Sequence, residues 1–134
     1  MKIVRRWVPL VLCLALLTGC QGKPLPEGME EDAVLKAGQE VVVALVRGEY
    51  EDVAERFRED VQAQADQVRS LLETAAQGAG EYKELEDSMA TGRESEGEEF
   101  AVAVIIAKYE KRRLVFEVGF DPNMALIGLR IEKK

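Results

Sequence analysis

Two runs of sequence, 100-FAVAVIIA-107 and 114-LVFEVGF-120, decide the fold. Both show the two-residue period of β-strands, whose successive side chains point to opposite faces of a sheet. The first run places Phe100, Val102, Val104 and Ile106 on one face and Ala101, Ala103, Ile105 and Ala107 on the other. The second places Leu114, Phe116, Val118 and Phe120 together on one face. The runs are therefore predicted to pair antiparallel across a turn at Lys111 and Arg112.

Weaker strand signals flank this central pair. The turn formers at 121–123 precede an alternation of apolar side chains over residues 127–131, which predicts a further strand. Residues 81–89 predict a less regular strand, with Tyr82 as an apolar anchor. The second half of the chain is thus expected to form an antiparallel sheet of about four strands.

The first half of the chain shows helical periodicity instead. Apolar side chains at three- and four-residue intervals predict helices over residues 30–47, 50–61 and 66–77. Gly48 ends the first of these, and Gly78 with Gly80 ends the third. Helices that precede an antiparallel sheet predict an α+β domain, with about three helices packed on one face of the sheet.

The strand over residues 100–107 has no charged side chain on either face, unlike a strand with one side in water. It is therefore predicted to be central and covered on both faces. Because a single layer of helices covers only one face, we interpret the stripe of Ala101, Ala103, Ile105 and Ala107 as an outer sheet face. A second copy, giving a homodimer, or another envelope protein would dock there. The alternative is that sheet curvature turns this stripe inward around a helix.

The amino terminus carries the features of a bacterial lipoprotein signal. Basic residues precede an apolar stretch, Trp7 to Leu17, of 11 residues. That length suits a secretory signal, whereas a bilayer core needs about 20 residues. The residues that follow, Leu17, Thr18, Gly19 and Cys20, resemble a lipobox.

This resemblance predicts the domain organisation. Residues 1–19 are expected to be a cleaved signal peptide, residues 20–29 a lipidated tether and residues 30–134 a single domain. The bilayer is then a partner through acylated Cys20, and the protein lies on the extracytoplasmic side of the cell membrane. The alternatives are an ordinary secretory signal with an incidental Cys20, or an uncleaved anchor.

Composition excludes several classes of function. The chain has 18 basic residues, 25 acidic residues and no histidine, for a net charge of −7. Loss of Lys2, Arg5 and Arg6 with the signal peptide leaves 15 basic against 25 acidic residues, or −10. An acidic domain is unsuited to nucleic acid. Without histidine there is no histidine base, histidine ligand or serine–histidine pair, so no catalytic residue, metal site or cofactor is predicted.

The acidic residues themselves are interpreted as solvated surface. They gather in the segment 92-GRESEGEE-99 and again around Glu49, Glu51 and Asp52. Neither run has the ligand spacing of a calcium-binding loop. Glu117 and Arg130 face away from the apolar stripe and are expected to form no more than a surface pair across neighbouring strands.

Three short motifs carry a resemblance to a known family. They are Gly48-Glu49-Tyr50-x-x-Val53-Ala54-x-x-Phe57, then Gly80-Glu81-Tyr82-Lys83, and finally Phe120 with Leu126-Ile127-Gly128-Leu129. Over residues 33–131 the chain resembles the bacterial family known as domain of unknown function 3887. Many members carry a tryptophan in the third helix, where this chain has Leu72.

The resemblance implies a fold of the nuclear-transport-factor-2-like, or cystatin-like, kind, with a curved sheet wrapped around helices. That superfamily often places ligand sites between helices and sheet, which implies a cavity lined by Tyr50, Phe57 and Tyr82. The alternative is that these aromatic side chains fill the core. The family has no established activity, so the resemblance implies a fold and almost no function.

Three functions compete. The first is a noncatalytic membrane-tethered domain that binds a small ligand or another protein. The second, implied by the superfamily, is an isomerase or dehydratase that uses a cavity aspartate with Tyr50 or Tyr82. The third is an accessory subunit of an envelope complex.

Overall fold

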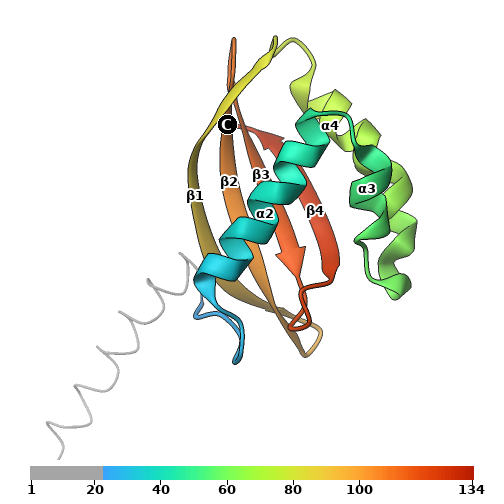
Figure 1. Ribbon diagram of the computed structural model, residues 1–134, viewed down its shortest axis with the longest axis vertical. Coiled ribbons are helices and arrows are strands. Elements are labelled where there is room, and N and C mark those ends of the chain that lie inside the picture. The colour runs from blue at the N-terminus through green and yellow to red at the C-terminus, as the bar shows by residue number, and fades with distance from the viewer. Residues whose placement is uncertain (1–22) are drawn as a thin grey trace, which may run out of the picture.

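The computed structural model describes residues 23–134 and shows helices on one face of an antiparallel sheet (Figure 1). The helices are α2 (Glu31–Val46), α3 (Tyr50–Glu55), the 3₁₀ helix η1 (Glu59–Gln67) and α4 (Val68–Ala76). The strands are β1 (Tyr82–Ser95), β2 (Glu98–Tyr109), β3 (Arg113–Phe120) and β4 (Leu126–Lys133), in the order β1-β2-β3-β4. The predicted α+β architecture is confirmed. None of the helices between Lys23 and Lys134 has both the length and the apolar character needed to cross a bilayer.

The alanine stripe of β2 lies under the helices, so its interpretation as an outer face was wrong. In the antiparallel register, Ala103 lies opposite Val118 and Ile105 opposite Phe116, and all four side chains are fully buried. Helix α2 crosses this face of the sheet (Figure 1). The alternative, in which the stripe is turned inward around a helix, is the one that the structure adopts.

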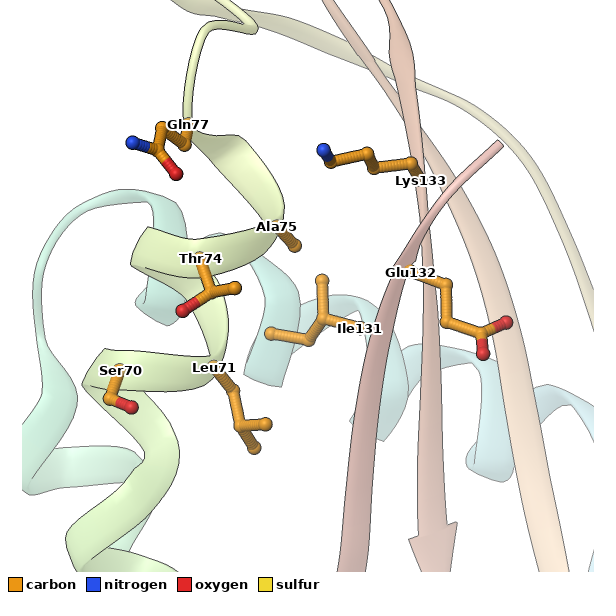
Figure 2. Close-up of a pocket in the computed structure, with 8 residues that line it drawn as sticks. All are labelled: Ser70, Leu71, Thr74, Ala75, Gln77, Ile131, Glu132 and Lys133. Atoms are coloured by element: carbon orange, nitrogen blue, oxygen red, sulfur yellow. The ribbon is translucent and has the colours of Figure 1, made fainter.

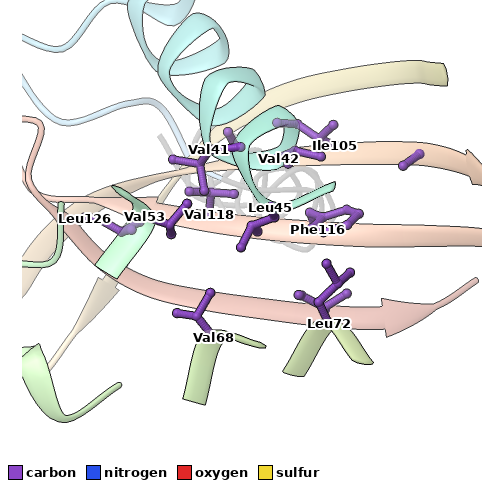
Figure 3. Close-up of a cluster of buried hydrophobic side chains, with 14 of the residues drawn as sticks. Val41, Val42, Leu45, Val53, Val68, Leu72, Ile105, Phe116, Val118 and Leu126 are labelled. Atoms are coloured by element: carbon purple, nitrogen blue, oxygen red, sulfur yellow. The ribbon is translucent and has the colours of Figure 1, made fainter. Parts of the chain in front are cut away.

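Small side chains explain why α2 lies so close to β2. A Cβ atom added to Gly38 of α2 would lie 2.5 Å from the Cβ of Ala103 and 3.0 Å from the Cδ1 of Ile105. Larger residues at either position would push the helix away from the strand. The core surrounds this contact. Its side chains (Figure 3) include Val41, Val42, Leu45, Val53, Val68, Leu72, Ile105, Phe116, Val118 and Leu126.

The second predicted helix, over residues 50–61, is interrupted. Helix α3 ends at Glu55, and Phe57 forms a parallel bridge with Leu126 of β4. The Arg58 N–H donates to the Leu126 carbonyl at 2.8 Å, and the Leu126 N–H donates to the Arg56 carbonyl at 3.0 Å. This extended segment places Phe57 in the core, where it is 4% exposed. Tertiary contact therefore overrides helical periodicity here.

Strands β1 and β2 form a longer hairpin than predicted. The acidic segment 92–99 continues both strands around a two-residue turn at Glu96 and Gly97. Both residues have positive φ, 53° and 82°, as the tightest hairpin turns require. Asparagine would suit the first position better than glutamate, so the sequence signal for this turn is weak.

Residues ahead of α2 also belong to the folded domain. Lys23 pairs with Gly92 of β1 through backbone hydrogen bonds of 3.2 Å and 2.7 Å. Pro26 and Met29 are buried. Most of the segment assigned to a tether is thus held on the domain, and only Gln21 and Gly22 separate Cys20 from Lys23 in the sequence.

Candidate functional site

The three aromatic residues predicted to line a cavity do not share one environment. Phe57 lies in the core beside Leu126, whereas Tyr50 and Tyr82 are half-buried. Tyr82 packs edge-on against Tyr109, with 5.7 Å between ring centroids. The structure therefore gathers tyrosines from α3, β1 and β2 and leaves Phe57 outside this group.

The tyrosine group is suited to packing more than to acid–base chemistry. Burial, with smaller contributions from the nearby Tyr82 and Tyr50, raises the pKa of Tyr109 to about 12. Burial likewise raises the pKa of Tyr82. The Arg69 guanidinium lies over the Tyr50 ring, 5.6 Å from its centroid, and holds it by a cation–π contact. Phenols of raised pKa stay protonated near neutral pH and can act as hydrogen-bond donors.

A groove of about 620 Å³ lies between α4 and β4 (Figure 2). It forms because α4 directs Val68 and Leu72 towards the core and leaves its more polar face beside the edge of the sheet. The groove is lined by Ser70, Leu71, Thr74, Ala75 and Gln77 from α4 and the residue after it, and by Ile131, Glu132 and Lys133 from β4. Its volume is within the range of ~300–1,000 Å³ typical of ligand pockets.

The charges around this groove are mostly paired. Arg69 pairs with Glu73 at 3.2 Å on α4, and Arg130 pairs with Glu132 on β4. Lys133 differs, because no carboxylate between Lys23 and Lys134 lies within ion-pair distance of its amine. In Figure 2 this amine extends from β4 across the groove towards Gln77. The groove thus combines apolar surface, hydroxyl and amide groups and one cation.

This groove is not predicted from the sequence. Ser70 and Thr74 are four residues apart, so they share one helix face, but a polar helix face most often faces water. Ile131 was expected only as part of a strand. The two walls meet through packing between elements that are about 60 residues apart, which local patterns do not encode.

The sheet face without helices is also apolar. It carries Phe100, Val104 and Ile106 of β2, all half-buried. Val102 on the same face is only 2% exposed. An ion pair of 2.9 Å between Arg93 of β1 and Glu117 of β3 passes over β2 and covers this side chain.

The expected surface pair between Glu117 and Arg130 does not form, although the two residues are opposite each other in the β3–β4 register. Glu117 pairs with Arg93, and Arg130 pairs with Glu132 instead. A shallow hollow of about 270 Å³ lies beside these two ion pairs, over Gly119 and Gly128.

An ion cluster around Arg58 joins the helical part to the sheet. Arg58 contacts Asp60 and Glu98 at 2.6 Å each and Asp121 at 3.2 Å. Glu98 and then Asp60 raise the pKa of Arg58, and Arg58 lowers the pKa of Asp60. Glu98, interpreted from the sequence as solvated surface, is therefore part of a connection between η1 and β2. Residues 23–134 contain no group of His, Cys, Asp or Glu arranged to hold a metal ion.

Asp121 is the buried member of this cluster, at 4% exposure. Its Oδ1 accepts from the N–H groups of Asn123 and Ala125, both at 2.9 Å. We expect Asp121→Ala to lower the free energy of unfolding by about 1–2 kcal/mol, because these N–H groups lose their acceptor. Asp121→Asn, which keeps the Oδ1 acceptor, should lose less. Urea unfolding of both variants checks this, and equal losses would contradict the assigned role of Oδ1.

The fold and the groove define a class: a small α+β domain with a four-stranded antiparallel sheet, helices on one face and a groove at the sheet edge. More particularly, the chain belongs to the family described as "Protein of unknown function (DUF3887)", whose model matches residues 38–129. The family resemblance of the sequence motifs is thereby confirmed.

A solved structure supports the fold. The NMR structure of a protein from Ruminococcus gnavus ATCC 29149 is similar to this chain, with a TM-score of 0.66 and 26% sequence identity. The match covers 80% of this chain and 95% of that one. A search of curated proteins gives no match.

Proposed function

We propose that this protein is a lipoprotein, anchored through Cys20 on the extracytoplasmic side of the cell membrane, whose domain binds a ligand without catalysing a reaction. The observation that supports binding is the α4–β4 groove, with apolar surface beside Ser70, Thr74 and Lys133. The chain has no histidine, the residue that most often acts as the general base for a serine or threonine hydroxyl. The lipobox, Leu17 to Cys20, supports the anchor and lies outside the described residues.

Labelling tests the anchor. Cells that express the full chain and are fed radioactive palmitate should label the wild-type protein, and Cys20→Ala should remove the label and release the domain from the membrane fraction. Cys13→Ala is the matched control, because Cys13 lies in the predicted signal peptide; that variant should stay labelled and membrane-bound. A Cys20→Ala protein that keeps its label would overturn the proposed anchor.

The predicted protein partner on the open sheet face stays a prediction. Because the alanine stripe is buried, a partner that docks on the sheet would have to use the other face, which carries Phe100, Val104 and Ile106. Substitutions at Ala103 would disturb the core and would not report on docking, because Ala103 is fully buried.

A further inference from the structure

One side of the groove is the edge of the sheet. Strand β4 ends the strand order β1-β2-β3-β4. Near its start, Leu126 is already paired on that side with the segment Arg56–Arg58, which runs parallel to β4. Within residues 23–134, no strand pairs with that side of Gly128–Lys133. The chain thus begins a fifth strand at this edge and then turns away into η1.

The groove continues along the edge where this short segment stops. Ile131 to Lys133 form one wall, and α4 stands opposite with Leu71 and Ala75 (Figure 2). An exposed strand edge presents backbone N–H and C=O groups at regular spacing, and a second extended chain satisfies them by strand addition. The wall of this groove therefore matches a peptide backbone better than a compact small molecule.

We propose that the groove receives an extended peptide segment of a partner protein, which adds to β4 as a further strand and places a carboxylate at Lys133. Alternate side chains of the segment would contact the apolar surface of Leu71, Ala75 and Ile131. Ser70 and Thr74 supply hydrogen-bonding groups on the opposite wall. This inference rests on the proposed binding function and names its ligand class.

The carboxylate follows from charge. Glu73 and Glu132 near the groove are each paired with an arginine, at Arg69 and Arg130. Lys133 is the cation that extends over the groove without a carboxylate in contact among the residues described. An acidic side chain or a carboxyl terminus on the peptide would complete the same kind of pair.

The test uses the full-length protein in nanodiscs and a random nonapeptide library displayed on phage. Selected peptides are synthesised, and their affinities are measured by fluorescence anisotropy. Each peptide is also made with a single N-methyl group at each position in turn. Because alternate residues of an added strand direct their N–H groups to the edge, N-methylation should weaken binding about tenfold at every second position and little between them.

Protein variants locate the site. Ser70→Arg places a bulky side chain in the groove and should weaken binding at least about tenfold. Ser95→Arg, the same change on the exposed β1–β2 hairpin, is the matched control and should bind like wild type. Lys133→Gln should weaken peptides that carry a carboxylate, and should leave their amide analogues unchanged.

The outcomes separate the two proposals. No selected peptide, equal binding to Ser70→Arg, or N-methyl effects without alternation would overturn strand addition. A small molecule that binds wild type but not Ser70→Arg, with no peptide bound, would retain the groove as a binding site and reject the peptide. The labelling of Cys20 is independent of all these results.

Discussion

Phe116→Ala is expected to lower the free energy of unfolding by about 3–5 kcal/mol, the usual cost of truncating a fully buried phenylalanine. Phe116 is 0% exposed and lies opposite Ile105 in the β2–β3 register. It belongs to the same buried cluster as Leu45 of α2 and Leu72 of α4 (Figure 3). Its loss would leave a cavity between the sheet and two helices, which urea unfolding monitored by circular dichroism measures.

Val115→Ala provides the neighbouring control. Val115 lies on the open face of the same strand and is half-buried. Its truncation should cost about 1 kcal/mol, because the Val115 side chain buries less apolar area than the Phe116 side chain. A Phe116→Ala cost below about 0.5 kcal/mol, or a larger cost for Val115→Ala, would contradict the assignment of the two sheet faces.

Gly38→Ala should destabilise the protein by about 2–3 kcal/mol, even though alanine forms helices better than glycine. The added Cβ would stand 2.5 Å from the Cβ of Ala103, in a contact between a helix and the central part of the sheet. The backbone fixes both Cβ atoms, so no side-chain rotation can relieve this contact. Relief therefore requires α2 to move as a whole, away from β2.

The double variant Gly38→Ala with Ala103→Gly tests this contact directly. Removal of the Ala103 Cβ makes room for the Cβ added at position 38. The double variant should therefore lose less stability than the sum of the two single losses, by about 1 kcal/mol or more. Thermal unfolding of the two single variants and the double variant provides the cycle. Additive losses would mean that the helix and strand are not in the tight contact described.

The strand period and the helix period were enough to predict the α+β class and most element positions. They could not assign the faces of β2, because both of its faces are apolar and parity alone then does not distinguish them. In β3, by contrast, Glu117 marks the outer face, and Phe116 on the opposite face is fully buried. The deciding information for β2 lies in Gly38, whose missing side chain admits Ala103.

Features made by distant contacts were harder to predict. The end of α3 depends on Leu126, which is 69 residues from Phe57 in the sequence. The α4–β4 groove similarly arises where Leu71 and Ile131 are brought near each other by packing. Of the predicted cavity residues, only Tyr50 and Tyr82 come close to a common neighbour, Tyr109. Ser70 and Thr74 share one face of α4, but no local sequence pattern indicates which element lies opposite that face.

The pairing of Lys23 with Gly92 has a consequence for how the domain would stand on a membrane. With the proposed anchor at Cys20, the three residue steps from Cys20 to Lys23 span at most about 10 Å. The domain would therefore be held close to the membrane surface. The end of the molecule that holds Lys23 and the β1–β2 hairpin would face the lipid headgroups. Helix α4, which forms one wall of the groove, lies towards the opposite end of the molecule (Figure 1), so the bilayer would not obstruct segments of other proteins that approach this wall.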